Sequence, residues 1–339
     1  MECGIIGLPN VGKSSFFKLL TNNEVLIKNY PFSTIKPNIS YIKVYDNRIE
    51  KIAKLLNYNK VENNNYIKLI DIAGIIKNSY KGKGLGNIFL SHINNTKILI
   101  NIIRFFYNKE IININNNIID PIYEYKIIKN ELIMKDIVNI KKKILINDNI
   151  KYKNILKKIL LLLKKKKKKD IKKFYKIENN NLNKIKNINL LSIKPCYYIL
   201  NINKYTEREE IKYIKKYFLK KKEKILFLDI KKNINNNNKK NIKKLINKIY
   251  YKLNYNIFFT IDEKRKKICS WKIKNNTYAY KASEKIHSTF SKKIIKIKKI
   301  NYKKFIINFN IKNYKNNFII KNKFYKIKDG DIIYFILNK

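Results

Sequence analysis

Two glycines five residues apart, followed at once by a lysine and a serine, stand directly after the first apolar run of the chain. The apolar run is Cys3 to Ile6, and the next segment, Gly7 to Ser14, reads Gly-Leu-Pro-Asn-Val-Gly-Lys-Ser. Glycine permits backbone conformations that a Cβ would block, so successive N–H groups can turn onto phosphate oxygens at the start of a helix. The spacing predicts a phosphate-binding loop between a strand and a helix over 13–20.

The two residues that close this loop predict its ligand. Lys13 is expected to reach the β- and γ-phosphates of a nucleotide, and the Ser14 hydroxyl is expected to ligate Mg²⁺. Seven of the 8 glycines lie within the first 86 residues, so glycine is concentrated where the backbone must be free to bend. The alternative is an ordinary turn with the same letters.

Several apolar runs in the first two thirds of the chain end in a polar residue. One spans 67–70 and ends at Asp71, another spans 98–104, and a third spans 197–200 and ends at Asn201. Parallel strands bring their carboxyl ends to one edge of a sheet, where ligands bind. This pattern predicts an α/β fold with a mostly parallel sheet.

Two other regions differ from the first part of the chain in composition and in the spacing of their apolar residues. From Glu131 to about Leu190 the chain is rich in lysine, with apolar residues at helical spacing, which predicts an inserted pair of long antiparallel helices. From Asn254 onward short alternating segments return, which predicts a small β-rich domain. Within it, strands over 324–328 and 332–337 are expected to form a hairpin around Asp329-Gly330-Asp331.

The composition bears on partners and location. The formal net charge is +53, from 77 Lys and Arg against 24 Asp and Glu. Such an excess predicts a polyanionic partner such as RNA or the ribosome, although part of it reflects a composition dominated by Ile, Lys and Asn. Three cysteines without metal-like spacing favour a reducing cytoplasm. No targeting segment is expected, because the first strand begins almost at Met1. No membrane interaction is expected either, because the apolar runs fall below the roughly 18 residues that a membrane crossing needs.

Two further segments complete the expected nucleotide site. Thr34 lies in a segment held extended by Pro31 and Pro37, and is expected to add a Mg²⁺ ligand. Asp71-Ile72-Ala73-Gly74 should supply a carboxylate to Mg²⁺ and, from Gly74, an N–H to the γ-phosphate. The next residue, Ile75, cannot orient an attacking water, so slow intrinsic hydrolysis is expected. Asn10 either offers its carbonyl to a monovalent cation such as K⁺ or is an ordinary turn residue.

Taken together, these segments closely resemble the YchF family of P-loop NTPases, also called the Obg-like ATPases. The resemblance rests on 7–14, 29–38, 71–74 and the segment Lys81 to Asn87, and continues through Lys194-Pro195, Trp271, 286–290 and 329–331. It implies a G-domain interrupted by a helical coiled-coil insert and followed by a ubiquitin-like, β-grasp TGS domain. It also implies ribosome binding and Mg²⁺-dependent hydrolysis of ATP in preference to GTP.

The resemblance divides the chain into G-domain residues 1–130, a helical insert over 131–190, the base-binding side of the G-domain over 191–253 and a TGS domain over 254–339. It makes Asn201 a base-contacting residue. The nucleotide-binding residues are then expected to be Asn10, Val11, Gly12, Lys13, Ser14, Ser15, Asn201 and Ile202. The expected Mg²⁺ ligands are Ser14, Thr34 and Asp71, and Lys13, Thr34 and Gly74 are expected to act in hydrolysis.

Two positions depart from the family. Lys204 replaces the acid of the base-reading motif, and Asn113 stands where the family carries a proposed catalytic histidine. These departures keep two alternatives open. One is an Obg-type GTPase, and the other is an RNA- or ribosome-binding module with little hydrolysis.

Overall fold

The computed structural model describes residues 2–21, 38–72, 93–107, 119–165, 170–171, 173–174, 188–235, 246–247, 250, 255–309 and 314–338. The chain divides into two compact units. The first consists of residues 1–41 and 68–238, and the second of residues 42–67 and 239–339.

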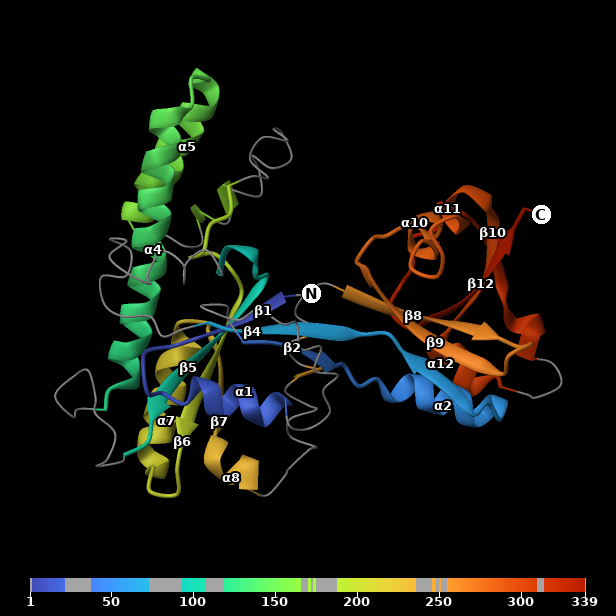
Figure 1. Ribbon diagram of the computed structural model, residues 1–339, viewed down its shortest axis with the longest axis horizontal. Coiled ribbons are helices and arrows are strands. Elements are labelled where there is room, and N and C mark those ends of the chain that lie inside the picture. Colours follow the sequence, from blue (N-terminus) through green and yellow to red (C-terminus); the bar gives the residue numbers. More distant parts are fainter. Residues whose placement is uncertain are drawn as a thin grey trace. The chain divides into compact units, whose positions relative to one another are not determined.

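The first unit is built on a six-stranded sheet with the strand order β2-β4-β1-β5-β6-β7 (Figure 1). Its strands are β1 (Glu2–Ile6), β2 (Asn38–Lys43), β4 (Tyr66–Asp71), β5 (Ile98–Phe105), β6 (Cys196–Ile202) and β7 (Lys224–Leu228). The five strands from β4 to β7 in this order are parallel. β5 lies at the centre and is buried along its whole length, including its two polar residues, Asn101 and Arg104. The expected mostly parallel α/β sheet is confirmed.

Short helices follow the strands of this unit. They are α1 (Lys13–Thr21) after β1, α7 (Arg208–Lys220) after β6 and α8 (Ile230–Asn235) after β7. α1 buries Phe16, Leu19 and Leu20, which recur at helical spacing. The carboxyl ends of the parallel strands, from which these helices begin, therefore share one edge of the sheet.

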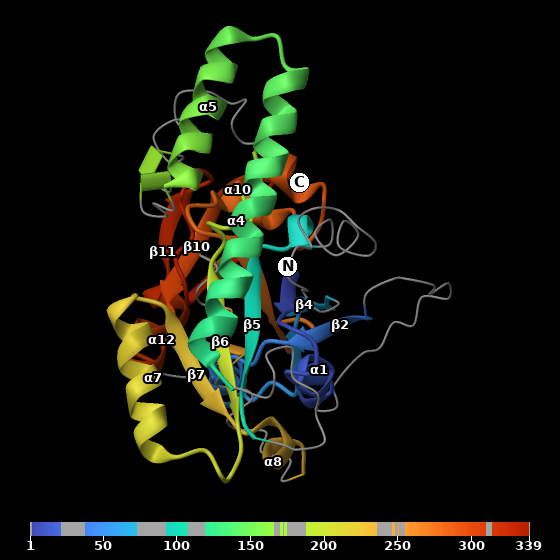
Figure 2. The same ribbon diagram turned by 90° about the vertical axis from the view of Figure 1, so that its left-hand side faces the viewer.

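The expected pair of long helices is present as α4 (Pro121–Ile146) and α5 (Ile150–Lys164). The two helices lie side by side and extend away from the sheet of this unit (Figures 1 and 2). α4 begins ten residues before the expected start at Glu131, because Asp120 caps it by accepting hydrogen bonds from the N–H groups of Ile122 and Tyr123 at 2.8 and 3.0 Å. Pro121 occupies the first helical position, where its missing N–H costs nothing.

The second unit contains a mixed six-stranded sheet with the order β11-β10-β12-β8-β9-β3. Its strands are β3 (Lys60–Asn63), β8 (Tyr255–Asp262), β9 (Lys267–Lys274), β10 (Ile294–Asn301), β11 (Ile319–Asn322) and β12 (Asp331–Leu337). Its helices are α2 (Asn47–Leu56), α10 (Ala279–Ser283), α11 (Phe290–Lys293), α12 (Tyr302–Ile307) and the 3₁₀ helix η3 (Tyr314–Asn317). The expected β-rich carboxy-terminal region is therefore observed.

The expected hairpin around Gly330 is wrong. β12 pairs antiparallel with β10 and in parallel with β8, whereas 324–328 joins no strand apart from a bridge between Lys326 and Tyr278. The Asp331 carboxylate instead accepts a hydrogen bond from the Lys328 N–H at 2.9 Å. Gly330 is nevertheless needed at this turn, since its φ is +82°. The alternating sequence identified strand-like segments but not their pairing partners.

Residues 42–67, which lie within the expected G-domain range 1–130, belong to the second unit. β3 extends that unit's sheet by pairing in parallel with β9. Behind it, the Asn65 amide donates to the Ser270 hydroxyl at 2.9 Å, and this hydroxyl donates to the Asn63 side chain at 3.1 Å. β3 therefore joins the sheet formed by the carboxy-terminal part of the chain, and α2 contacts β9 of that sheet.

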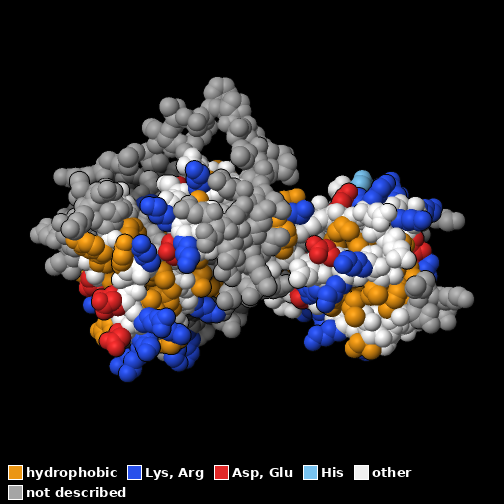
Figure 3. Space-filling view, turned by 90° about the horizontal axis from the view of Figure 1, so that it is seen from below, with side chains coloured by type: hydrophobic (Ala, Val, Ile, Leu, Met, Phe, Trp, Pro, Cys, Tyr) orange, Lys and Arg blue, Asp and Glu red, His pale blue; other side chains and the backbone are white. Residues whose placement is uncertain are grey.

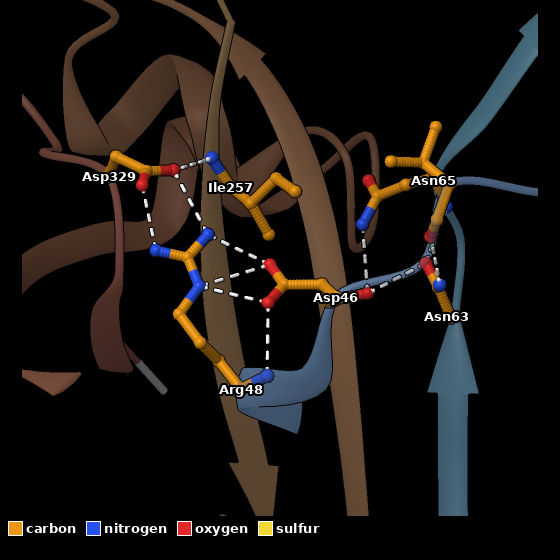
Figure 4. A network of polar contacts seen from close by, with 8 residues as sticks. Asp46, Arg48, Asn63, Asn65, Ile257 and Asp329 are labelled. Atoms are coloured by element: carbon orange, nitrogen blue, oxygen red, sulfur yellow. Dashed lines mark hydrogen bonds and ion pairs between the residues drawn. The ribbon is translucent and has the colours of Figure 1, made fainter. Parts of the chain in front are cut away.

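Arg48 fastens α2 within the second unit (Figure 4). Its guanidinium donates hydrogen bonds to both oxygens of Asp46 and of Asp329, with the shortest contact, 2.7 Å, to Asp329. The Asp329 carboxylate also accepts the Ile257 N–H at 2.8 Å. The guanidinium lies 5.4 Å from the centre of the Phe259 ring, so β8 contacts it on one face.

Among the described residues, no helix combines the length with the apolar character that a bilayer crossing requires.

Candidate nucleotide-binding site

The loop after β1 has the backbone geometry that its glycines predict. Asn10 and Gly12 adopt positive φ values of 61° and 99°. A Cβ on Gly12 would also stand 2.7 Å from the side-chain nitrogen of Asn201, and one on Gly7 would stand 2.5 Å from the Ile102 carbonyl oxygen. Both glycines are therefore required, one mainly by backbone conformation and the other by close packing.

α1 begins directly at the loop. The Phe16 N–H donates to the Gly12 carbonyl at 2.9 Å, so the N–H groups before it are available to a ligand. The helix dipole favours an anion at this end. Val11 is buried, whereas Asn10, Ser14 and Ser15 are exposed, which leaves the polar members of the expected set accessible.

The Lys13 ammonium folds back over the loop. Its Nζ donates a hydrogen bond to the Leu8 carbonyl at 2.7 Å. Burial lowers the pKa of Lys13 to about 8, while the negative charges of Asp71 and Glu124 act in the opposite direction. A lysine held in this way remains mostly protonated at neutral pH and lies beside the phosphate loop.

Asp71 and Ser14 come together although 57 residues separate them in sequence. β4 pairs with β1, and Asp71 is the last residue of β4. The side chains of Asn38 and Ser14 lie beside its carboxylate. Burial raises the pKa of Asp71, while the positive charge of Lys13 and the polar side chains of Asn38 and Ser14 favour the charged carboxylate.

Asn201 ties the phosphate loop to the next part of the sheet edge. It lies near the end of β6 and is 8% exposed. Its amide donates to the Val11 carbonyl at 3.1 Å, and its side-chain oxygen accepts the Ile230 N–H at 3.3 Å. Ile202, the last residue of β6, is half-buried. Beyond it, Lys204 points its ammonium over the Tyr205 ring, 4.8 Å from the ring centre.

Two charged residues of the site were missed by sequence reasoning. Arg104 lies near the end of β5, opposite Asn201 in register, and Glu124 lies in the first turn of α4. The Glu124 carboxylate accepts the Arg104 N–H at 3.0 Å, and burial raises the pKa of Glu124 to about 7. The Asp-Pro start of α4 could have placed Glu124 at a helix N-terminus, but nothing local in the sequence brings that terminus to Lys13.

Several expected positions lie outside the described residues. They are Thr34, Gly74, Ile75, Asn113 and the segment Gly82 to Gly86. Within the part of the chain that is described, no three His, Cys, Asp or Glu side chains gather as a metal cage. The paired hydroxyl and carboxylate of Ser14 and Asp71 fit Mg²⁺, which prefers oxygen ligands and usually shares them with phosphates.

The sheet order, the loop between β1 and α1 and the acid at the end of β4 together define a P-loop nucleoside triphosphatase with a G-domain fold. A family model described as a 50S ribosome-binding GTPase matches residues 2–204, and the YchF carboxy-terminal model, described as a protein of unknown function, matches residues 255–338. This protein belongs to the YchF family.

Curated relatives are similar over the whole chain. The "Ribosome-binding ATPase YchF" of Buchnera aphidicola is 36% identical, and the match covers 99% of both chains. The protein of that name from Mycoplasma genitalium is 32% identical over 100% of this chain and 99% of its own. "Obg-like ATPase 1" of Pongo abelii is 28% identical over 100% of this chain and 92% of its own.

A solved structure has the same fold. The YchF GTPase of Schizosaccharomyces pombe superposes with a TM-score of 0.77 and 24% sequence identity, and the match covers 99% of this chain and 97% of that one. At this identity the likeness supports the fold, including the second unit. The assignment of that unit to the TGS class remains a prediction from the resemblance.

Proposed function

We propose that this protein binds ATP with Mg²⁺ at the phosphate loop, hydrolyses it slowly, and works as a nucleotide-dependent switch on the ribosome. The observation that carries the proposal is the meeting of Lys13, Ser14 and Asp71 at the carboxyl edge of the parallel sheet, beside a loop whose backbone is shaped for phosphate. The names of the relatives, ribosome-binding ATPases, support the choice of nucleotide and partner.

The residues of the site have separate roles in this proposal. Backbone N–H groups from Asn10 to Ser15 bind the phosphates, and Lys13 exchanges the Leu8 carbonyl for phosphate oxygens. Ser14 and Asp71 hold Mg²⁺, with Thr34 as a further ligand from the segment before β2. When bound, Mg²⁺ neutralises charge on the β- and γ-phosphates. Gly74 would contact the γ-phosphate and so couple hydrolysis to the segment that follows it.

Steady-state ATP turnover tests the enzymatic part. Lys13→Ala should abolish Mg²⁺-dependent turnover, because no other side chain is proposed to bind the β- and γ-phosphates. Lys18→Ala is the matched control, since Lys18 is exposed on the same helix and lies one turn further along. Equal turnover by both variants would contradict the assignment of the site.

A binding module with little hydrolysis is the second candidate. Ile75 and Asn113 favour it, because neither side chain can activate water as the residues usual at such positions do. Nucleotide binding without turnover, in wild type and Lys18→Ala alike, would support the module. Turnover that disappears only in Lys13→Ala would exclude it.

The choice between adenine and guanine depends on the residues around Asn201. The two polar ends of the Asn201 amide bond to Val11 and Ile230, and Lys204 stands where the family places an acid. We propose that ATP is still preferred. Titration of ATP, ADP, GTP and GDP tests this: tenfold tighter binding of GDP than of ADP, about 1.4 kcal/mol, would favour the Obg-type GTPase instead.

A monovalent cation is a further proposal at Asn10. The left-handed backbone there already suits an asparagine, so a turn role and a K⁺ role remain alternatives. Replacing KCl by NaCl at constant ionic strength should lower turnover if K⁺ is bound near the phosphates. Unchanged turnover would leave Asn10 as a turn residue.

The charge of the chain supports the proposed ribosome contact in the cytoplasm. The net charge of +53 favours a polyanion, and lysine and arginine side chains are prominent on the face drawn in Figure 3. Co-sedimentation with ribosomes should be strong at low salt and should weaken steeply as salt rises. Failure to co-sediment at low salt, with and without nucleotide, would contradict ribosome association.

A further inference from the structure

Three aromatic side chains lie together on the surface of the second unit. Tyr278 and Tyr280 are stacked at 15° with ring centres 6.0 Å apart, and Phe324 stands edge-on to them at 6.3 and 5.8 Å. Phe324 is 57% exposed and Tyr278 is 37% exposed. We call these three residues the aromatic platform. The hydrophobic core of the unit does not account for two large rings that are this exposed.

The backbone holds the platform in place. The N–H groups of Ala279 and Tyr280 donate to the carbonyls of Tyr325 and Lys323 at 2.8 and 3.1 Å. On the other side of the bridge between Tyr278 and Lys326, the Ile327 N–H donates to the Thr277 carbonyl at 3.0 Å. Tyr280 also packs against the buried core of this unit. The rings are therefore presented in a fixed arrangement, which lowers the entropy cost of binding.

The surroundings of the platform are basic. The Lys326 ammonium lies 5.6 Å from the centre of the Tyr278 ring, and the Lys323 ammonium lies 5.6 Å from that of Phe324. The two segments that form the platform, 277–285 and 321–328, contain six lysines and one acidic residue, Glu284. A ligand for this surface must carry distributed negative charge and offer flat faces to the exposed rings.

We propose that the aromatic platform binds unpaired bases of single-stranded RNA, with the bases stacked on Phe324 and Tyr278 and the flanking lysines near the phosphates. Base stacking on aromatic side chains combined with a basic surface is how proteins bind single strands with little sequence preference. A duplex is a poor ligand, because its bases are already stacked on each other. The proposal rests on the proposed ribosome association and names the kind of RNA that this unit contacts.

Fluorescence anisotropy with the full chain tests the proposal, using a labelled single-stranded RNA of mixed sequence and the matching duplex at low salt. The single strand should bind more tightly than the duplex. Phe324→Ala and Tyr278→Ala should each weaken single-strand binding about tenfold, within the range found for loss of one stacked base. Tyr278→Phe should retain wild-type affinity, because it keeps the ring. Tyr213→Ala, at a tyrosine that is 65% exposed on α7, is the matched control and should bind as wild type does.

The lysines give a second readout. The double variant Lys323→Gln, Lys326→Gln should flatten the dependence of log affinity on log salt by about 1.4, since each phosphate contact contributes roughly 0.7 for a single strand. An unchanged slope would place the phosphates elsewhere and overturn the lysine part of the proposal.

Several results would each overturn the platform as an RNA site. These are equal affinity for the single strand and the duplex, or equal losses of RNA affinity in Phe324→Ala and Tyr213→Ala. A third is that Phe324→Ala and Tyr278→Ala lower the thermal stability but leave the RNA affinity unchanged. If the alanine variants lost ribosome co-sedimentation but kept single-strand binding, the partner would be a protein, which also overturns it. Normal ATP turnover and co-sedimentation without oligonucleotide binding would refute the platform alone, whereas oligonucleotide binding without co-sedimentation would refute the ribosome association.

Discussion

At the scale of single residues, the buried amide of Asn201 links two segments of the candidate nucleotide-binding site. The side chain bonds to the Val11 carbonyl in the phosphate loop and to the Ile230 N–H at the start of α8. These two segments follow different strands of the sheet and have no hydrogen bond to each other among the described contacts. Asn201 therefore fixes the phosphate loop relative to the segment after β7.

We expect Asn201→Ala to lower the free energy of unfolding by about 1 to 3 kcal/mol, because a buried carbonyl and a buried N–H lose their partner. Nucleotide affinity should fall as well, since the loop loses its support. Urea unfolding and nucleotide titration would measure the two effects. Lys204→Ala, at an exposed position three residues on, should change stability by no more than about 0.5 kcal/mol. Similar stability losses in the two variants would contradict the role of Asn201.

Glu124 predicts an unusual dependence of stability on pH. Burial raises its pKa from 4.5 to about 7 in the folded protein, so between these pH values the folded state binds more protons at this group than the unfolded chain does. The free energy of unfolding that this group contributes must therefore fall as the pH rises from about 4.5 to 7. Arg104 and Lys13 limit the effect by favouring the charged carboxylate.

Glu124→Gln should abolish this fall in the free energy of unfolding with rising pH, because an amide does not ionise and can still accept the Arg104 N–H. The variant should be more stable than the wild type at pH 8 by up to about 3 kcal/mol, and the difference should vanish near pH 4. Thermal unfolding of both proteins across this range is the measurement. A difference that stayed constant with pH would mean that Glu124 does not titrate as described.

Local sequence explains which residues of the site could be foreseen. Glycine, lysine and serine in the phosphate loop act within a few residues of one another, so their spacing alone predicts the positive φ at Gly12 and the start of α1. Glu124 reaches the site only because α4 begins beside β5. That placement depends on tertiary packing, which the sequence does not display. The role of Asn201 as a tie between two loops was hidden for the same reason.

At the scale of secondary structure elements, α2 and β3 are the elements whose place was not foreseen. Their sequence has ordinary signals: Asp46 caps α2, and the helix ends at Asn57 in a left-handed conformation. These signals mark only the ends of the helix and say nothing of its partner, β9, which lies about 200 residues further along. The missing hairpin at Gly330 is the same kind of error, because turn chemistry was recognised while strand pairing was not.

The hydrogen bonds of the Arg48 guanidinium to Asp46 and Asp329 should dominate the attachment of α2 to the rest of the second unit. Arg48→Lys should lower the free energy of unfolding by about 1 to 3 kcal/mol, because one ammonium cannot replace a planar fork that bonds two carboxylates. Arg265→Lys is the control: Arg265 is exposed and meets Asp262 at 3.9 Å. That change should cost no more than about 0.5 kcal/mol. Chemical unfolding of the two variants decides whether the fork matters more than a surface pair.

At the scale of the whole molecule, the chain passes between its two units three times, after residues 41, 67 and 238. A cut after 238 therefore does not separate the units cleanly, because α2 and β3 remain behind without β8 and β9. Ile49 and Ile52, which are 3% and 0% exposed in the whole protein, would lose their cover.

This arrangement predicts that the same two substitutions have opposite effects in a shortened chain and in the full chain. In residues 1–238, the double change Ile49→Ser, Ile52→Ser should reduce aggregation, because it removes exposed apolar surface. In the full chain the same change should lower the melting temperature, because it removes buried side chains. Light scattering of the short chain and thermal unfolding of the long one would test this. Less aggregation of residues 1–238 together with a higher melting temperature of the full chain would contradict the assignment of α2 to the second unit.

The pairing of β3 with β9 also has a consequence for synthesis. Lys60 lies opposite Lys267, so the second partner is translated 207 residues after the first. At a translation rate of about 5 to 20 residues per second, β3 and the apolar side of α2 remain without their partner strand for roughly 10 to 40 seconds. During this time the first unit is still being completed. A nascent chain of this protein therefore carries an uncovered strand and an uncovered helix through most of its own translation, and this interval is when it most needs a chaperone.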